Sequence, residues 1–201
     1  MSSNVSLEAH LNANAKSLYL SLAYLGLGDK GVDQVSKRLR DNISLRHLEL
    51  RGCAITPAGC VVLAHSLRNN STLEVLNLAR NQIGRGSIGV EALRDVLYFN
   101  DTLKQLDLRH NGLRSEHIIG LVQLLKSDST ITHLALSGNK IGNEAGELLL
   151  EALNSNTSLI DVQLTGCDIK ADILRDIAGK LNRNAKQNPP SPSPQKKSGA
   201  N

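Results

Sequence analysis

The chain has 201 residues, with 23 Lys and Arg against 19 Asp and Glu, so its net charge at pH 7 is only +4. Aromatic residues make up 2% of a chain that is 40% apolar and contains 35 leucines, which means that aliphatic side chains must fill its core. This composition excludes a wholly disordered chain, and no apolar run is long enough to span a membrane.

The start of the chain lacks the basic region and continuous apolar stretch of a secretory signal. The three cysteines, Cys53, Cys60 and Cys167, are odd in number, which favours reduced thiols over a disulfide framework. We therefore expect a cytoplasmic protein, with the nucleus and the cilium or cytoskeleton left open as locations.

The first expected element is a helix within residues 1–16. The segment Leu7–Asn14 matches Leu63–Asn70, which closes a later repeat. A helix laid over the first exposed end gives a repeat array a polar outer face. We therefore predict that residues 1–16 form an N-terminal capping helix, equivalent to half a repeat.

Six repeats follow, each opening with a version of L-x-x-L-x-L-x-x-(N/C)-x-(I/L). Their starting points, at positions 17, 45, 73, 103, 131 and 159, are 28, 28, 30, 28 and 28 residues apart. The predicted repeats are 17–44, 45–72, 73–102, 103–130, 131–158 and 159–186, together residues 17–186. The alternating leucines predict a short strand in each repeat.

The second half of each repeat has apolar residues at helical spacing, such as Leu63 and Leu67. An Asn or Asp follows three residues after the last of them, where we expect left-handed backbone to end the helix. These positions are Asn42, Asn70, Asn100, Asp128, Asn156 and Asn184. The predicted repeat is therefore strand, turn, helix, turn.

A buried polar slot follows each strand, where the turning backbone needs hydrogen-bond partners. We expect Asn81, Asn111 and Asn139 to form a structural ladder there, with Cys53 and Cys167 as small buried residues in the same slot. Leu25 breaks the pattern in the first repeat. The third repeat carries two extra residues within Gly84–Ser87.

The 28-residue period, the strand motif and the L-x-x-x-L-x-x-N helix ending resemble the ribonuclease-inhibitor type of leucine-rich repeat. The resemblance covers residues 17 to about 184. It implies an α/β solenoid of about six repeats, with a curved parallel sheet on the concave face and helices on the convex face. It also implies a protein-binding function, because this repeat type occurs in inhibitors, GTPase regulators, immune receptors and ciliary scaffolds.

The composition changes after the last repeat. Residues 187–201 are rich in Pro, Ser and Lys and contain no large aliphatic side chain, so we expect a disordered or polyproline-like tail. Ser191 and Ser193 each precede a proline and are candidate phosphorylation sites. Without this tail and Lys186, residues 1–184 carry a net charge of only +1, from 20 basic and 19 acidic residues.

Side chains between the core leucines should point onto the open concave face, because successive residues of a strand alternate. These residues are mixed polar and charged, and they either pair locally with each other or orient a protein partner. The candidate binding residues on this face and its edges are Tyr19, Tyr24, His47, Glu49, Arg51, Asn77, Arg80, Gln105, Asp107, Arg109, His110, His133, Asp161 and Gln163.

Two irregular features could also matter for binding. Tyr98 and Phe99 stand where other repeats have polar pairs, so they either cover the inserted loop of their own repeat or form a convex-side anchor. Arg85 lies within the insertion. The surrounding Gly84–Ser87 lacks the G-x-x-x-x-G-K-(S/T) motif of a phosphate-binding loop, so we expect only an altered edge loop.

The sequence offers no catalytic motif, so we expect no enzymatic activity, no metal and no cofactor. There is no H-x-x-x-H pair and no G-x-S-x-G, and His47 and His133 would lie three strands apart. Because the basic excess belongs mostly to the tail and stacking aromatics are scarce, we expect neither nucleic-acid nor membrane binding.

The leading hypothesis is a non-enzymatic protein-binding module, an intracellular scaffold or adaptor that uses its concave face and edge loops. We expect a monomer on its own or a subunit of a larger assembly. The alternatives are a regulator of a small GTPase, similar to Ran GTPase-activating proteins, and the recognition part of an immune-type receptor. Ran regulators are longer and typically end in an acidic segment, and no nucleotide-binding domain is visible in this sequence.

Overall fold

The computed structural model describes residues 6–127 and 130–188, in which short strands alternate with helices. The strands are β1 (Tyr19–Ser21), β2 (His47–Glu49), β3 (Val75–Asn77), β4 (Gln105–Asp107), β5 (His133–Ala135) and β6 (Asp161–Gln163). The helices are α1 (Leu7–Ala13), α2 (Gly28–Arg40), α3 (Pro57–Leu67), the 3-10 turn η1 (Ile83–Arg85), α4 (Ile88–Leu97), α5 (Ser115–Leu125), α6 (Gly142–Ala152) and α7 (Ala171–Gln187).

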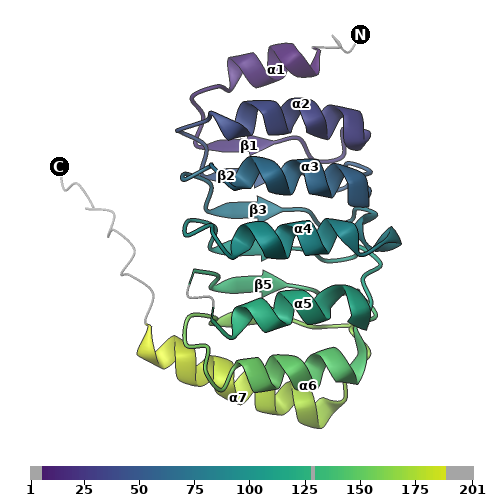
Figure 1. Cartoon of the computed structure of the whole chain (residues 1–201), viewed down its shortest axis with the longest axis vertical. Coiled ribbons are helices and arrows are strands. Elements are labelled where there is room, and N and C mark those ends of the chain that lie inside the picture. Colours follow the sequence, from purple (N-terminus) through teal and green to yellow (C-terminus); the bar gives the residue numbers. More distant parts are fainter. Residues whose placement is uncertain (1–5, 128–129, 189–201) are drawn as a thin grey trace, which may run out of the picture.

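All six strands lie in one parallel sheet whose spatial order is the chain order, β1 to β6 (Figure 1). The middle residue of each strand points into the core, and each pairs with the equivalent residue of the next strand: Leu20, Leu48, Leu76, Leu106, Leu134 and Val162. This arrangement confirms the predicted α/β solenoid. It also explains the strand length, because only three residues per repeat pair before the chain turns toward its helix.

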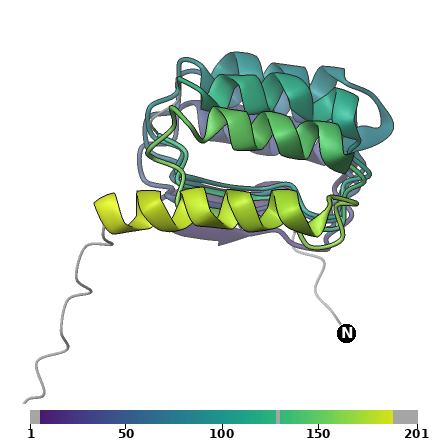
Figure 2. The same ribbon diagram turned by 90° about the horizontal axis from the view of Figure 1, so that it is seen from below.

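Helices α2 to α6 form one layer over the inner face of the sheet, and the opposite face of the sheet is open (Figure 2). Helix α7 departs from this layer and lies level with the sheet. Its buried residues Ile177 and Leu181 line the same hollow as Leu164 of the last repeat, and Ile173 lies against Gly146 of α6. The final helix therefore closes the end of the core with one apolar face.

The core between sheet and helices consists of aliphatic residues and buried cysteines. Leu48, Leu76, Leu63 and Leu93 are completely buried, and none of the buried core residues is aromatic among those described. Repetition accounts for this, because the same slots must be filled in every repeat and leucine packs well against a leucine in the next copy. At the N-terminal end, α1 contributes Leu11 to the same core.

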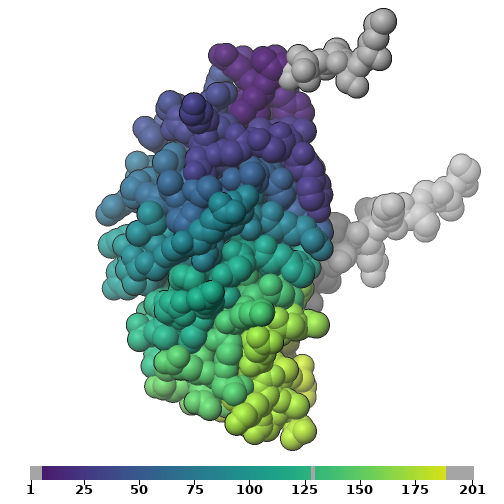
Figure 3. Space-filling model, turned by 90° about the vertical axis from the view of Figure 1, so that its right-hand side faces the viewer, coloured from purple at the N-terminus to yellow at the C-terminus, as the bar shows by residue number. Residues whose placement is uncertain are grey.

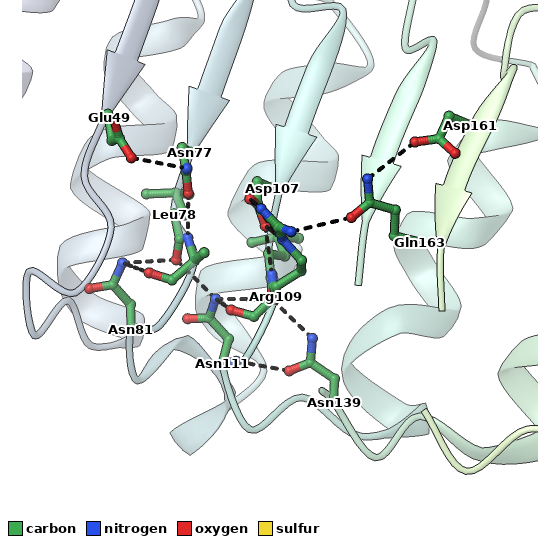
Figure 4. Close-up of polar contacts among 12 residues, drawn as sticks. Glu49, Asn77, Leu78, Asn81, Asp107, Arg109, Asn111, Asn139, Asp161 and Gln163 are labelled. Carbon is green, nitrogen blue, oxygen red and sulfur yellow. Dashed lines mark hydrogen bonds and ion pairs between the residues drawn. The ribbon is translucent and has the colours of Figure 1, made fainter. Parts of the chain in front are cut away.

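The strand-to-helix turns are held by buried asparagines (Figure 4). Asn81 Nδ2 donates to the carbonyls of Leu50 and Leu78, in two successive repeats, while its Oδ1 accepts from the backbone of Cys53. Asn111 and Asn139 make equivalent bonds one and two repeats later. Cys53 and Cys167 occupy the same slot, where each thiol lies within hydrogen-bond distance of a carbonyl of the preceding repeat, at 3.1 and 3.2 Å respectively.

The asparagines after the helices do not have the left-handed backbone conformation that the sequence predicted. None of those described has a positive φ. Instead, Asn70 Nδ2 donates to the carbonyls of Leu39 and Asn42, and its Oδ1 accepts from the amide of Leu73. Asn100 repeats this pattern, so the side chains form a second ladder at the opposite edge of the array.

At the C-terminal end, helix α7 continues past Asn184 to Gln187, so the last repeat does not end its helix at that asparagine. Asp128, the two candidate phosphorylation sites and the rest of the tail from residue 189 lie outside the described residues. None of the helices in the described ranges has both the length and the apolar character needed to cross a membrane.

Candidate protein-binding surface

The strand register arranges the outward-facing residues of the sheet in columns. The first column is Tyr19, His47, Val75, Gln105, His133 and Asp161. The second is Ser21, Glu49, Asn77, Asp107, Ala135 and Gln163. Because neighbouring parallel strands are about 4.8 Å apart, side chains within a column can contact each other from one repeat to the next.

Glu49 organises the N-terminal half of this face. Its carboxylate accepts a 2.7 Å hydrogen bond from the Tyr19 hydroxyl and longer ones, at 3.4 Å, from Ser21 and Asn77. The Tyr19 ring also lies against the His47 ring, with centroids 4.8 Å apart. Donation to Glu49 raises the pKa of Tyr19, because ionising the phenol would remove the bond. One carboxylate thus ties three strands together.

Arg109 organises the C-terminal half (Figure 4). It forms an ion pair with Asp107 of its own repeat, at 2.5 Å, and its other terminal nitrogen donates to Gln163 at 3.3 Å. Gln163 lies two strands away, and Ala135 separates it from Asp107 in the second column, where its small side chain leaves room for the contact between Arg109 and Gln163. Gln163 in turn donates to Asp161.

The two expected charge pairs therefore differ. Asp107 and Arg109 pair, whereas no ion pair joins Glu49 to Arg51 within the described part of the chain. The Arg51 guanidinium instead lies 5.6 Å from the ring centroid of Tyr24, a cation–π arrangement at the edge of the sheet. The interpretation of the face as local charge pairing holds for only one of the two pairs.

A further column, three residues beyond the end of each strand, was not expected from the sequence. Its members all have positive φ, between 54° and 73°: Tyr24, Gly52, Arg80, His110, Gly138 and Gly166. The Tyr24 ring lies over Gly52, and the His110 ring lies over Gly138, so a side chain at either glycine would overlap the ring. The sequence signal was available: in both cases a glycine follows an aromatic residue one repeat later.

The third-repeat insertion forms η1 and extends further from the array than its neighbouring loops (Figure 1). A Cβ at Gly84 would overlap the backbone of Gly112 in the next repeat, so the insertion packs tightly against that repeat. Arg85 is exposed near its tip.

Tyr98 and Phe99 lie at the C-terminal end of α4, whereas η1 precedes the N-terminal end of the same helix. They do not cover the inserted loop, and the interpretation that they do is wrong. Their rings meet edge to face with centroids 5.0 Å apart, remain 67% and 62% exposed, and the Arg68 guanidinium lies over Phe99. They border a groove whose other wall includes Gly120 and Leu124 of α5.

Comparisons with known proteins agree with this architecture. A model described as Leucine Rich repeat matches residues 41–64, 69–93, 99–116 and 127–150. Pig ribonuclease inhibitor is 30% identical over 173 residues, which are 84% of this chain and 37% of the inhibitor. Bovine NACHT, LRR and PYD domains-containing protein 3 is 31% identical over 176 residues, which are 87% of this chain and 17% of that protein.

The chain is a leucine-rich-repeat protein of the ribonuclease-inhibitor type. It spans well under half the length of these curated relatives. Among solved structures, the C-terminal domain of Caenorhabditis elegans tropomodulin has a TM-score of 0.68 at 19% identity, covering 78% of this chain and 94% of that one. Leiomodin-1 actin-binding site 2 has a TM-score of 0.56 at 17% identity, covering 90% and 88%.

The cysteines and histidines are the remaining side chains of this leucine-rich-repeat protein with possible reactivity. The three cysteines are free and buried, and burial, together with the charge of Asp29, raises the pKa of Cys60 to about 12. On the concave face, His133 shares a hydrogen bond with Thr132, and Gln105 is exposed. Across residues 6–127 and 130–188, no three His, Cys, Asp or Glu side chains gather as a metal site would require.

Proposed function

We propose that this leucine-rich-repeat protein is a non-enzymatic protein-binding module, acting in the cytoplasm as a scaffold or adaptor. The observation that carries the proposal is the polar network on its open sheet face. Glu49 and Arg109 each fix side chains from neighbouring strands, so much of the face is ordered before a partner arrives. Preorganised side chains lose less conformational entropy on binding, which favours specific recognition.

The chemistry of the face fits recognition better than catalysis. Glu49 is held by three neutral donors and Asp107 by Arg109, which leaves neither carboxylate placed to exchange protons with a substrate. The thiols are buried, with their pKa values raised by burial, so none is an accessible nucleophile.

An affinity-capture experiment tests the binding face. The concave variant replaces the exposed residues Tyr19, Gln105 and Gln163 by alanine. A matched control replaces one tyrosine and two glutamines that are exposed on the helices and their ends, Tyr98, Gln34 and Gln123. Proteins captured from cytosol are quantified for all three forms, and the strongest is then purified and its affinity for each form measured.

We expect the partner to bind the unmodified protein and the control alike and to lose at least about tenfold in affinity for the concave variant, as for a central hot spot. Equal binding to all three forms, or selective loss in the control, would contradict a concave binding face. Loss in the control alone would place the interface at the convex side, around Tyr98.

Two direct assays separate the proposal from other classes. One measures GTP hydrolysis by small GTPases, including Ran, with and without the protein; an acceleration would favour the GTPase-regulator alternative. The other measures pancreatic ribonuclease activity, because the pig relative is named a ribonuclease inhibitor. We expect no effect in either assay for a scaffold or adaptor.

A further inference from the structure

Six of the described basic side chains form ion pairs. Six ion pairs join described side chains, and five of them involve a basic residue on a helix or on the approach to a strand: Lys37–Asp33, Arg46–Glu74, Arg94–Asp95, Lys104–Glu74 and Lys126–Glu151. The sixth is Asp107–Arg109. Among the described basic residues outside these pairs, some, such as Arg38, Arg40 and Arg175, are exposed on helices, whereas several others are gathered at the strand-to-helix edge.

These unpaired cations lie together in the second to fifth repeats. We define the basic edge as Arg80, Arg85, Arg114 and Lys140, all exposed, with Arg51 beside it. Their backbones place them in neighbouring repeats: Arg80 donates from its amide to the carbonyl of Arg109, and Arg114 and Lys140 form a parallel bridge. Figure 3 shows the molecule from the right-hand side of Figure 1, toward which the strands point.

The inserted residues of the third repeat add to this charge. Arg85 ends η1, whose Gly84 packs against Gly112, and Gly86 lies near Pro57 of the preceding repeat. The insertion therefore contacts the repeats on both sides of it, and its Arg85 side chain is exposed. Glu91 and Glu116 follow in the first turns of α4 and α5, but no ion pair joins either to these arginines in the described ranges.

We propose that the basic edge binds an acidic, carboxylate-rich segment of a protein partner, deepening the proposed function on which it rests. Unpaired like charges that are close together repel each other, and they attract a complementary segment and speed its association. Guanidinium groups suit this role because they bind carboxylates through two parallel hydrogen bonds.

A protein segment fits this edge better than a nucleic acid. The four exposed cations lie in three successive repeats, or roughly 10 Å of sheet, which is shorter than the reach of the 6 to 10 phosphate contacts of a protein bound along a duplex. Single-stranded nucleic acid is usually held by stacking on aromatic rings. At this edge, Tyr24 and His110 each pack one ring face over a glycine of the next repeat, which leaves only the other face of each ring for stacking.

The test uses a fluorescein-labelled peptide of about 12 residues with alternating Glu and Ser, and a control peptide with Gln for Glu. Binding is measured by fluorescence anisotropy at about 50 mM and about 200 mM NaCl, since screening distinguishes charge-driven binding. The edge variant is R80E/R85E/R114E. The matched control, R38E/R40E/R175E, reverses three exposed arginines on α2 and α7 and has the same net charge.

We expect the unmodified protein to bind the Glu peptide and not the Gln peptide, with weaker binding at the higher salt concentration. The edge variant should lose about tenfold or more at low salt, and the control about twofold or less. Equal losses in the two variants would overturn the proposal, because net charge alone would then explain binding. Absence of peptide binding would overturn it as well.

Two further probes test the occupant. Oligothymidine of similar length and vesicles containing phosphatidylserine are measured against the same three proteins. If either probe bound more tightly than the Glu peptide, and the edge variant lost that binding, the ligand of the basic edge would be that polyanion and not an acidic protein segment. The concave variant should keep its affinity for the Glu peptide. The two proposals are therefore tested independently: failure of peptide binding at the basic edge would not contradict the concave binding face, and failure of the concave face would not prevent the peptide measurement.

Discussion

The imidazole ring of His110 packs over the backbone of Gly138 in the following repeat. Gly138 has φ +73°, and a Cβ there would overlap the imidazole. The pair joins the fourth and fifth repeats at the edge of the concave face, and Tyr24 and Gly52 form the same contact between the first and second. Two different constraints therefore require glycine at position 138, namely backbone conformation and space.

Gly138→Ala should separate these two constraints. The positive φ alone costs an L-residue about 1 to 2 kcal/mol, and the steric overlap with His110 should raise the loss of unfolding free energy to about 3 kcal/mol. Gly142→Ala is the matched control, because its φ is also +73° but nothing lies within 4 Å of the added Cβ.

Urea unfolding of the two variants measures the difference. Adding His110→Ala to Gly138→Ala should bring the loss back to about that of Gly142→Ala, since it removes the overlap and leaves the backbone cost. If Gly138→Ala and Gly142→Ala were equally destabilising, the ring contact would carry no energetic weight.

Asn111→Leu should be strongly destabilising because it removes a buried hydrogen-bonding hub. Asn111 Nδ2 donates to the carbonyls of Leu78 and Leu108, and leucine leaves both without that donor. We expect a loss of about 2 to 4 kcal/mol. Asn111→Cys should lose roughly half as much, because the thiols of Cys53 and Cys167 already contact equivalent carbonyls.

The midpoint of urea unfolding, followed by circular dichroism, ranks these variants. Asn77→Ala is the control, since Asn77 is only half-buried and faces the concave side. Equal midpoints for Asn111→Leu and Asn111→Cys would show that the slot requires only volume and not a donor.

The fold could be predicted from the sequence because the same aliphatic positions recur in six copies. Leu48, Leu76 and Leu106 each indicate one strand, and their regular spacing along the chain indicates that these strands pair in one sheet. The helix-ending asparagines were assigned the wrong backbone geometry. The position of an asparagine in the repeat is the same whether its backbone is left-handed or its side chain bridges two repeats. The hydrogen bonds from Asn70 Nδ2 to the carbonyl oxygens of Leu39 and Asn42 show that the side chain bridges the repeats.

The polar surface was less predictable for a similar reason. Spacing places Glu49 and Arg51 on one face, as it does Asp107 and Arg109, yet only the second pair forms. Tyr19 and Asn77, which donate hydrogen bonds to the Glu49 carboxylate, belong to neighbouring strands, and the Tyr24 ring lies near the Arg51 guanidinium. Such contacts depend on the side chains of adjacent repeats, and residue spacing alone does not show which of these neighbours a charged side chain will contact.

The three thiols should be unreactive in the native protein. Burial raises the pKa of Cys53 and Cys167, and it raises that of Cys60 from 9.0 to about 12, so little thiolate exists near pH 8. A thiol reagent such as Ellman's reagent should react slowly at pH 8 and should then modify all three cysteines in guanidinium chloride.

The raised pKa of Cys60 also predicts a loss of stability in base. Its contribution is fully present below pH 9.0, the unfolded value, and is lost as pH rises toward about 12, because only the unfolded state then ionises easily. Replacing Cys60 by Ala should flatten this part of the pH dependence.

In the experiment with the thiol reagent, rapid modification of a single thiol in the native protein would contradict the burial of these side chains.

Tyr19 should titrate above the ordinary range of a phenol, and Glu49→Gln should lower its pKa. The Tyr19 hydroxyl donates to the Glu49 carboxylate at 2.7 Å, and ionisation would both remove that bond and bring two negative charges together. Absorbance near 295 nm follows tyrosinate, and subtracting the curve of Tyr19→Phe from that of the unmodified protein isolates this residue. Gln163→Glu is a control that adds a carboxylate at the far end of the second column, which also contains Glu49. If Glu49→Gln left the Tyr19 transition in place while Gln163→Glu moved it, the general charge of the concave face, and not the hydrogen bond across β1 and β2, would set the phenol's pKa.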